Sequence, residues 1–181
     1  MKNNVTKINN TKTNVWYRTL LFVYNMLDMV AESIDKLVEQ QAMNSFYYSS
    51  NFSDNDVMTV AEKIIALSER KVRLINIKVA TDNSLEECPV ELAQLLIEHY
   101  IDNDICEDVA KRHNLVLRTF YRKLQKAEGE FANNMIEKGY TEERIREEFK
   151  EDRWVIDIYK KFLSKCFREE VHLLEQEQEL C

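Results

Sequence analysis

The sequence from Ile105 to Ala127 reads ICEDVAKRHNLVLRTFYRKLQKA, and its spacing predicts two helices joined by a tight turn. Ala110 supplies the small side chain that two closely crossing helices require. Four residues later, Asn114 is one of the few residue types that adopt a left-handed backbone at low cost. The apolar residues that would hold the second helix against the first are Val109, Leu115, Phe120, Leu124 and Ala127. We expect a short helix over 105–113 and a longer one from 117 to about 138.

The face of the second helix opposite these apolar residues is polar and basic. From Glu107 to Lys126 the chain has six Lys and Arg residues and two acidic residues, a local charge of +4, whereas the whole chain carries −7. Such a local reversal of sign is typical of a surface that contacts phosphates, and a helix with this face fits the major groove of DNA. The residues predicted to contact DNA are Lys111, Arg112, Arg118, Thr119, Tyr121, Arg122, Gln125 and Lys126.

The remainder of the chain predicts an all-α fold, with two long amphipathic helices before this segment and a further helix after it. Two glycines and one proline in 181 residues are too few for the tight turns of a sheet-rich protein. The first long helix is expected over 15–43, with the apolar stripe Leu20, Val23, Leu27, Val30, Ile34, Leu37 and Val38. After a loop at 44–55, the second is expected over 54–79, with the stripe Val57, Val60, Ile64, Leu67, Val72, Ile75 and Val79. An antiparallel hairpin or a dimer seam would bury these stripes equally well.

Four segments are expected along the chain. Residues 1–14 are polar and read as a flexible N-terminus, and residues 15–83 read as the helical hairpin or dimerisation segment, with a break at 81–84. Residues 84–138 form the helix-turn-helix part, with Pro89 in the first turn of its first helix. Residues 139–181 form a C-terminal helix with an acidic tail, where Gly139 ends the preceding helix and Thr141 caps the next, which is expected to reach about 170.

The sequence CPVELAQLLIEHYIDNDICEDVAKRHNLVLRTFYRKLQKA, residues 88–127, resembles region 4 of bacterial sigma factors. In that family a helix ending in an aromatic-aliphatic pair, here Tyr100-Ile101, precedes a polar turn, a helix of the form VAxxxN and a recognition helix similar to RTxYRxLxKA. The preceding IDKLVEQQ and AEKIIALSERKVRLI segments look like those of short phage and prophage regulators of Gram-positive bacteria. The resemblance implies binding to double-stranded DNA, RNA polymerase as a further partner, and control of phage or mobile-element genes.

Two residues depart from the family pattern. Val116 stands where a Ser or Thr normally caps the recognition helix, and Leu117 is apolar at a site that often faces DNA. These departures bear on sequence specificity more than on the fold. The aromatic-rich promoter-melting region of a complete sigma factor is also missing, so a regulator that uses this module alone is expected.

Other classes of function are disfavoured by the residues. His99 and His113 have no second titratable group at a spacing that suggests catalysis, so no enzyme is expected. The four cysteines form no C-x-x-C pair, so neither a metal nor a cofactor is expected and reduced thiols suit a cytoplasmic protein. The longest apolar run, Leu20 to Val23, is far too short to span a membrane.

The sequence therefore predicts a DNA-binding transcriptional regulator, as a monomer or a homodimer. Two alternatives stay open. A small-terminase-like packaging protein also joins a helix-turn-helix to oligomerising helices, and it would form a ring of many subunits. A helical protein-interaction module would keep the fold without binding DNA.

Overall fold

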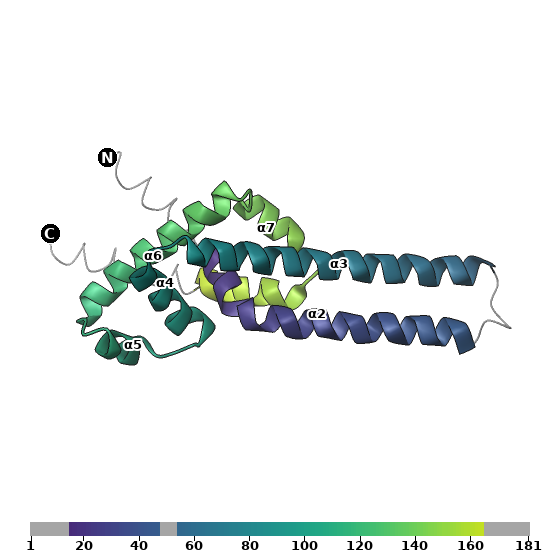
Figure 1. Ribbon diagram of the computed structural model, residues 1–181, viewed down its shortest axis with the longest axis horizontal. Helices are drawn as coiled ribbons and strands as arrows, with labels where there is room; N and C mark the ends of the chain where they lie inside the picture. The colour runs from purple at the N-terminus through teal and green to yellow at the C-terminus, as the bar shows by residue number, and fades with distance from the viewer. Residues whose placement is uncertain (1–14, 48–53, 165–181) are drawn as a thin grey trace. The chain divides into compact units, whose positions relative to one another are not determined.

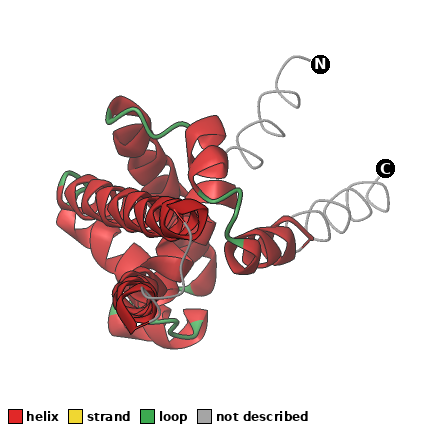
Figure 2. Ribbon diagram, turned by 90° about the vertical axis from the view of Figure 1, so that its right-hand side faces the viewer, coloured by secondary structure: helices red, strands yellow, loops and turns green. Residues whose placement is uncertain are grey.

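The computed structural model describes residues 15–47 and 54–164, and these residues form helices and short connections without a β-strand (Figure 2). The all-α prediction is confirmed for this part of the chain. The helices are α2 (Val15–Tyr47), α3 (Asp54–Glu86), α4 (Val90–Leu96), η2 (Ile97–Ile101), α5 (Cys106–Arg112), α6 (Leu117–Glu137) and α7 (Glu142–Glu148), followed by helical residues 153–164. The expected flexible N-terminus, 1–14, and the acidic tail from 169 lie outside the described residues.

The chain divides into two compact units. Unit 1 combines Met1–Val23 with Ala80–Cys181, and unit 2 is Tyr24–Val79. Helices α2 and α3 each pass from one unit into the other (Figure 1). No helix in the described ranges has both the length and the apolar character needed to cross a membrane.

Unit 2 is an antiparallel hairpin made by the parts of α2 and α3 that belong to it (Figure 1). Two ion pairs join the arms: Lys71 Nζ lies 2.6 Å from Asp35, and Lys78 Nζ lies 3.1 Å from Asp28. The Lys78 ammonium also lies 4.6 Å from the centre of the Tyr24 ring. Between these contacts the arms bury Leu27, Ile34, Leu74 and Ile77.

The predicted stripe of α3 is only partly the face that packs on α2. Val57, Val72, Ile75 and Val79 are exposed, whereas Leu74 and Ile77, which the prediction left out, are buried. The reason is that α3 has two apolar stripes, and the seam with α2 includes Lys71 and Lys78, whose charges satisfy Asp35 and Asp28. On α2 the prediction holds except at Leu37, which is 44% exposed.

Unit 1 has its core along α6. The buried face of this helix packs against α4, which contributes Leu92, Leu95 and Leu96. The start of α2 adds Tyr17, whose hydroxyl donates a hydrogen bond to the Tyr140 carbonyl at 3.1 Å. Helix 153–164 is held by stacking of Tyr159 on Trp16 at 4.2 Å and by an edge contact between Phe162 and Phe22. The buried residues of α6 are Phe120, Leu124, Ala127, Glu128, Phe131, Ala132 and Met135.

Three predicted breaks differ in the structure. The loop expected at 44–55 is helical at 44–47 and from Asp54, and residues 48–53 are outside the described part. The break expected at 81–84 is wrong, because α3 continues to Glu86 and the buried Ser84 hydroxyl donates to the Ala80 carbonyl at 2.7 Å within the helix. The C-terminal helix is not continuous, since α7 ends at Glu148 and a turn precedes residue 153.

Both predicted caps around 139–141 are confirmed. Gly139 has φ +81°, and the N–H groups of Gly139 and Tyr140 donate to Ile136 and Met135 in the pattern of a Schellman motif. The Thr141 hydroxyl accepts a hydrogen bond from the Arg144 N–H at 3.4 Å. Pro89 is the residue just before α4 instead of lying inside its first turn.

Candidate nucleic-acid interface

Helices α5 and α6 are joined by the tight turn that the sequence predicts. Asn114 has φ +53°, and Val109 and Ala110 are buried where α5 meets α6. The Leu115 N–H donates to the Ala110 carbonyl at 2.8 Å, and the Asn114 N–H donates to the Lys111 carbonyl at 3.1 Å. The small Ala110 side chain and the left-handed Asn114 therefore allow the chain to leave α5 after Arg112 and begin α6 at Leu117.

The first turn of α6 lacks a side-chain cap. Val116 occupies the capping position, and no side chain there accepts a hydrogen bond from the helix. Its carbonyl instead accepts from the N–H groups of Thr119 and Phe120, at 2.9 and 3.0 Å. The free N–H groups at this end lie beside exposed Val116 and Leu117 and remain available to an acceptor such as a phosphate oxygen.

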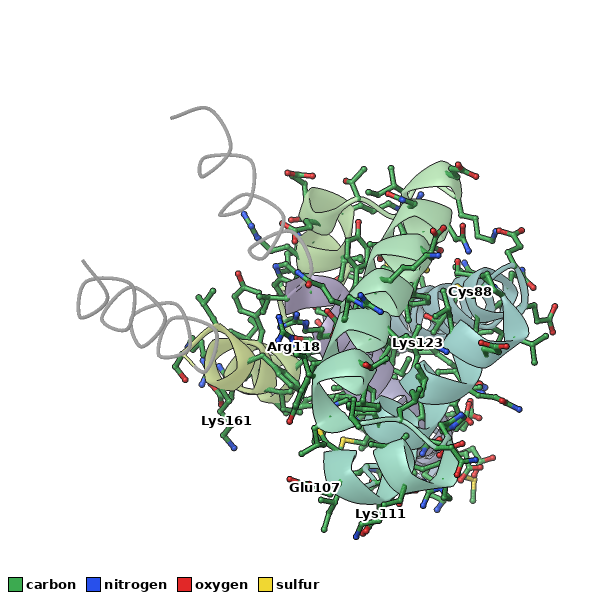
Figure 3. The ribbon with its side chains drawn as sticks, turned by 90° about the vertical axis from the view of Figure 1, so that its left-hand side faces the viewer. Cys88, Glu107, Lys111, Arg118, Lys123 and Lys161 are labelled. Atoms are coloured by element: carbon green, nitrogen blue, oxygen red, sulfur yellow. The ribbon has the colours of Figure 1, made fainter. Side chains whose placement is uncertain are left out.

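The outward face of α6 is basic and contains no acidic side chain over 118–126. Arg118, Arg122 and Lys126 recur every four residues, and all three are exposed opposite the buried Phe120 and Leu124. Figure 3 shows Arg118 and Lys123 at opposite edges of α6, with Lys111 on the neighbouring α5. Within the described part of the chain, the side chains of Arg118, Arg122 and Lys126 have no ion-pair or hydrogen-bond partner. Gln125 is likewise exposed on this face.

The predicted basic residues on α5 are placed differently, because acidic neighbours already bind them. Lys111 Nζ lies 3.4 Å from Asp108, and Arg112 forms ion pairs with Glu98, at 2.7 Å, and with Asp104. On the flank of α6, Lys123 lies 3.4 Å from Glu91. The structure thus separates the predicted residues into three unpaired cations on α6 and two paired cations on α5.

Glu98 joins η2 to the C-terminal end of α5, and it is not among the residues that the sequence predicted for this surface. It accepts hydrogen bonds from Arg112, and His113 Nε2 lies 3.0 Å from its other oxygen. Partial burial raises the pKa of Glu98, but the hydrogen bonds from Arg112 and His113 outweigh it and hold the pKa below its usual range. An ionised Glu98 therefore fixes the C-terminal end of α5 against η2. The spacing from Glu98 to Arg112 and His113 gives no signal in the sequence, because the contact depends on the π-helical turn at 97–101.

The other two predicted contact residues, Thr119 and Tyr121, carry no charge. Thr119 is half-buried, and Tyr121 is 51% exposed with its ring packed edge-on against Phe120. Together with exposed Val116 and Leu117, Tyr121 gives the start of α6 an apolar border beside its cations.

Comparisons with protein-family models, curated proteins and solved structures give no match. What this surface binds is therefore inferred from its own chemistry.

His99 and His113 are the two histidines in the described part of the chain, and each has a polar neighbour. His99 Nδ1 lies 3.7 Å from Cys106 Sγ and 3.3 Å from the Asp104 carbonyl. No three His, Cys, Asp or Glu side chains among the described residues are grouped closely enough to hold a metal ion. The His99 ring also packs edge-on against Phe120 on the buried face of α6, with 6.2 Å between the ring centres.

Proposed function

We propose that this protein is a DNA-binding transcriptional regulator in which α5 and α6 form a helix-turn-helix and α6 enters the major groove of double-stranded DNA. The observation that carries the proposal is the set of unpaired cations on α6. Arg118, Arg122 and Lys126 extend over two turns of a helix whose opposite face is fixed in the core of unit 1. A rigid helix with an acid-free, exposed basic face in a chain of net charge −7 is the local charge distribution that phosphate binding requires.

The residues on this face supply the main kinds of contact used in sequence readout. Arginine donates two hydrogen bonds to guanine, glutamine pairs with adenine, and apolar groups contact the methyl group of thymine. Arg118, Arg122 and Gln125 would take the first two roles, and Leu117 and Tyr121 the third. Lys126, further along α6, would contact a phosphate and contribute affinity without specificity.

The resemblance of residues 88–127 to sigma-factor region 4 makes this proposal more specific. In that reading the protein controls phage or mobile-element genes in the bacterial cytoplasm and contacts RNA polymerase as well as a promoter. Two residues of the resemblance support this proposal: Ala110 is buried within α5, and Asn114 has a left-handed backbone in the turn that follows.

The decisive experiment measures DNA binding by variants of α6. A duplex selected from a randomised pool by the wild-type protein serves as the ligand in fluorescence anisotropy. Arg118→Ala and Arg122→Ala should each weaken specific binding by roughly 1–3 kcal/mol, and Lys126→Ala should reduce the slope of log K against log salt by about 1. Lys63→Ala, which removes an exposed positive charge from unit 2, is the matched control and should leave affinity unchanged. Selection of no duplex, or the same affinity for the wild type and all four variants, would refute DNA binding by α6.

A second candidate is a protein-interaction module, which the exposed apolar border at the start of α6 favours. Val116 is 70% exposed and Tyr121 51%, and protein interfaces are enriched in such side chains. A Tyr121→Ser variant that keeps DNA affinity but loses capture of RNA polymerase would assign the border to a protein partner. A ring of many subunits in sedimentation would instead favour the DNA-packaging alternative.

A further inference from the structure

Helix α3 carries an exposed apolar stripe that repeats every seven residues. Met58, Ile65, Val72 and Val79 are 64%, 57%, 55% and 50% exposed. Between them, at the intermediate positions of the same stripe, stand Ala61, Ser68 and Ile75. Exposed apolar residues scattered singly are ordinary on a protein surface, but residues that recur at steps of three and four from Met58 to Val79 form one continuous edge.

This stripe is distinct from the face that α3 uses inside unit 2. The seam with α2 follows Val60, Ile64, Leu67 and Leu74, which are buried or half-buried. At 100° per residue, the centre of the exposed stripe lies about 115° around the helix from the centre of the seam. The arm of α2 within the hairpin therefore does not cover it, and α3 is an amphipathic helix with two apolar faces.

The middle of the stripe has the shape that a second helix requires. A shallow groove is lined by Ile64, Ile65, Ser68, Glu69, Val72 and Arg73. The small Ser68 lies between the larger Ile65 and Val72, and the small Ala61 lies one turn further toward Met58. Alternation of small and large side chains at these positions gives the holes into which side chains of a facing helix insert.

We propose that the occupant of this groove is α3 of a second copy of the same chain, packed antiparallel about a two-fold axis near Ser68. The stripe is symmetric about that point. An axis there places Met58 opposite Val79 of the second copy and Ile65 opposite Val72 of the second copy. A two-fold interface must be self-complementary in this way, because the same surface is used by both molecules.

The charges beside the stripe fit the antiparallel arrangement. Glu62 and Arg73 lie on the same flank, and the axis near Ser68 brings Glu62 within reach of Arg73 of the second copy. The two-fold axis produces this Glu62–Arg73 contact twice in the dimer. Charge contacts on the flanks of a helical pair contribute to partner choice and orientation more than to affinity.

The area of the stripe agrees with a dimer of moderate affinity. The exposed parts of Met58, Ile65, Val72, Ile75 and Val79 together give roughly 500 Å² of apolar surface, at the upper end of the patches that monomers leave uncovered. Two facing copies would remove about 1,000 Å² of apolar surface from water before the polar flanks are counted, which approaches the size of a specific interface. The inference does not depend on the DNA-binding proposal, since it concerns unit 2 alone.

The first test is the oligomeric state of the full chain by sedimentation velocity from about 1 to 200 µM. The wild-type protein should be a dimer at the upper concentrations. Ile65→Glu combined with Val72→Glu should raise the dimer dissociation constant at least about 100-fold, because two carboxylates would be buried in each copy. Val90→Glu is the matched control: Val90 is 73% exposed, lies in unit 1, and should leave the dimer unchanged. A wild-type protein that stays monomeric at 200 µM, or a double variant that still dimerises, overturns the proposal.

The second test fixes the orientation and does not rely on the double variant being folded. In a chain whose Cys106, Cys166 and Cys181 are replaced by Ser, Ser68→Cys should form an intermolecular disulfide on mild oxidation because it lies near the two-fold axis. Lys63→Cys, exposed on the same helix but outside the stripe, is the control and should not cross-link. Equal cross-linking of the two variants would show that collision and not a defined interface joins the chains, and the proposal would be wrong.

Discussion

Glu128 is a charged residue on the otherwise apolar face of α6. Its carboxylate accepts hydrogen bonds from Arg18 Nη2 at 2.6 Å, from Arg18 Nε at 2.9 Å and from the Tyr100 hydroxyl at 2.6 Å. The Glu128 side chain is 3% exposed and that of Arg18 16%. Three elements, α2, η2 and α6, therefore meet at one carboxylate, and both of its oxygens are satisfied.

Removing only Arg18 or only Glu128 should destabilise the protein more than removing both. Arg18→Met would leave a carboxylate in the core without its cation and should lower the free energy of unfolding by about 3–5 kcal/mol. Adding Glu128→Leu to Arg18→Met should recover most of that loss, since a hydrophobic pair of similar size often replaces a buried ion pair without penalty. Urea unfolding followed by circular dichroism measures both. A double variant as unstable as Arg18→Met would show that the network does more than satisfy charge.

Glu142, at the start of α7, should make stability depend on pH near neutrality. Burial and the neighbouring Glu143 carboxylate raise the pKa of Glu142 to about 7, and its Oε1 is buried without a partner among the described residues. Since the folded pKa lies above the unfolded value of 4.5, the contribution of Glu142 to stability is most favourable below pH 4.5 and falls as the pH rises toward 7. Glu142→Gln should abolish that fall and stabilise the protein at pH 8 by about 1–2 kcal/mol, less than the full shift implies because a half-buried carboxylate keeps part of its hydration.

The neighbouring Glu143 provides the control for this measurement. Its pKa is lowered by hydrogen bonds at the start of α7, from the backbone N–H of Glu143 and from Thr141, so any contribution it makes to stability changes only at lower pH. Because burial is the larger cause of the raised pKa of Glu142, Glu143→Gln should keep most of the wild-type fall in stability between pH 5 and 7 in thermal unfolding, reduced only by the part that the Glu143 carboxylate contributes. The assignment to Glu142 fails if its Gln variant keeps the slope as well.

At the scale of elements, the contact between α5 and α6 should tolerate little added volume. Ala110 is 2% exposed, and its carbonyl accepts the hydrogen bond that closes the turn. Ala110→Leu should therefore overpack the contact and destabilise the protein by about 1–3 kcal/mol. Lys111→Leu, one residue further on the exposed side, is the matched control and should leave the melting temperature unchanged. A wild-type melting temperature for Ala110→Leu would mean that the two helices do not cross closely.

The elements that were predictable from sequence are those with a local cause. Ala110 and Asn114 determine the turn between α5 and α6 through size and backbone preference, and Gly139 and Thr141 determine the ends of α6 and α7 in the same way. Ser84 shows the opposite case, because a polar residue that usually marks a break satisfies its hydroxyl inside the helix.

The assignment of faces could not be made from sequence where two stripes share one helix. The periodicity of α3 fits both the seam and the exposed stripe, and the seam contains Lys71 and Lys78, which hydrophobic periodicity discounts. For the candidate site, the exposure of Arg118 and Arg122 followed from their position opposite Phe120. The pairing of Arg112 with Glu98 and Asp104 could not be predicted, because these partners are 14 and 8 residues away in the sequence and are brought to Arg112 by the turn of η2.

At the scale of the whole molecule, unit 2 is inserted in the sequence of unit 1. The chain passes from unit 1 to unit 2 after Val23 and returns at Ala80. Each unit has its own buried side chains, such as Phe131 in unit 1 and Ile34 in unit 2. Both tryptophans of the chain, Trp16 and Trp154, belong to unit 1, so their fluorescence reports on that unit alone.

Shortening both arms of the hairpin by seven residues should leave unit 1 folded. Deletion of 31–37 together with 69–75 removes the pair Asp35–Lys71 and keeps Asp28 opposite Lys78, so the arms remain aligned. The midpoint of unfolding seen by tryptophan fluorescence should match that of the wild type, whereas self-association should weaken because Val72 and Ile75 are lost. A deletion of 31–37 alone is the control and should destabilise the hairpin. Loss of the tryptophan transition in the double deletion would contradict independent folding of unit 1.

The two ion pairs of the hairpin have a consequence for errors of alignment. Asp28 and Asp35 are seven residues apart, as are Lys71 and Lys78, so an arm that slips by one heptad still pairs Lys71 with Asp28. A misaligned hairpin therefore loses only one of its two electrostatic contacts, and charge alone discriminates weakly between the correct and the slipped form. Exchanging the charges of one pair, by Asp35→Lys with Lys71→Asp, would keep the native contacts and place two carboxylates together in the slipped form. With one pair reversed, the slipped hairpin would bring like charges together, and only the correct alignment would satisfy both pairs.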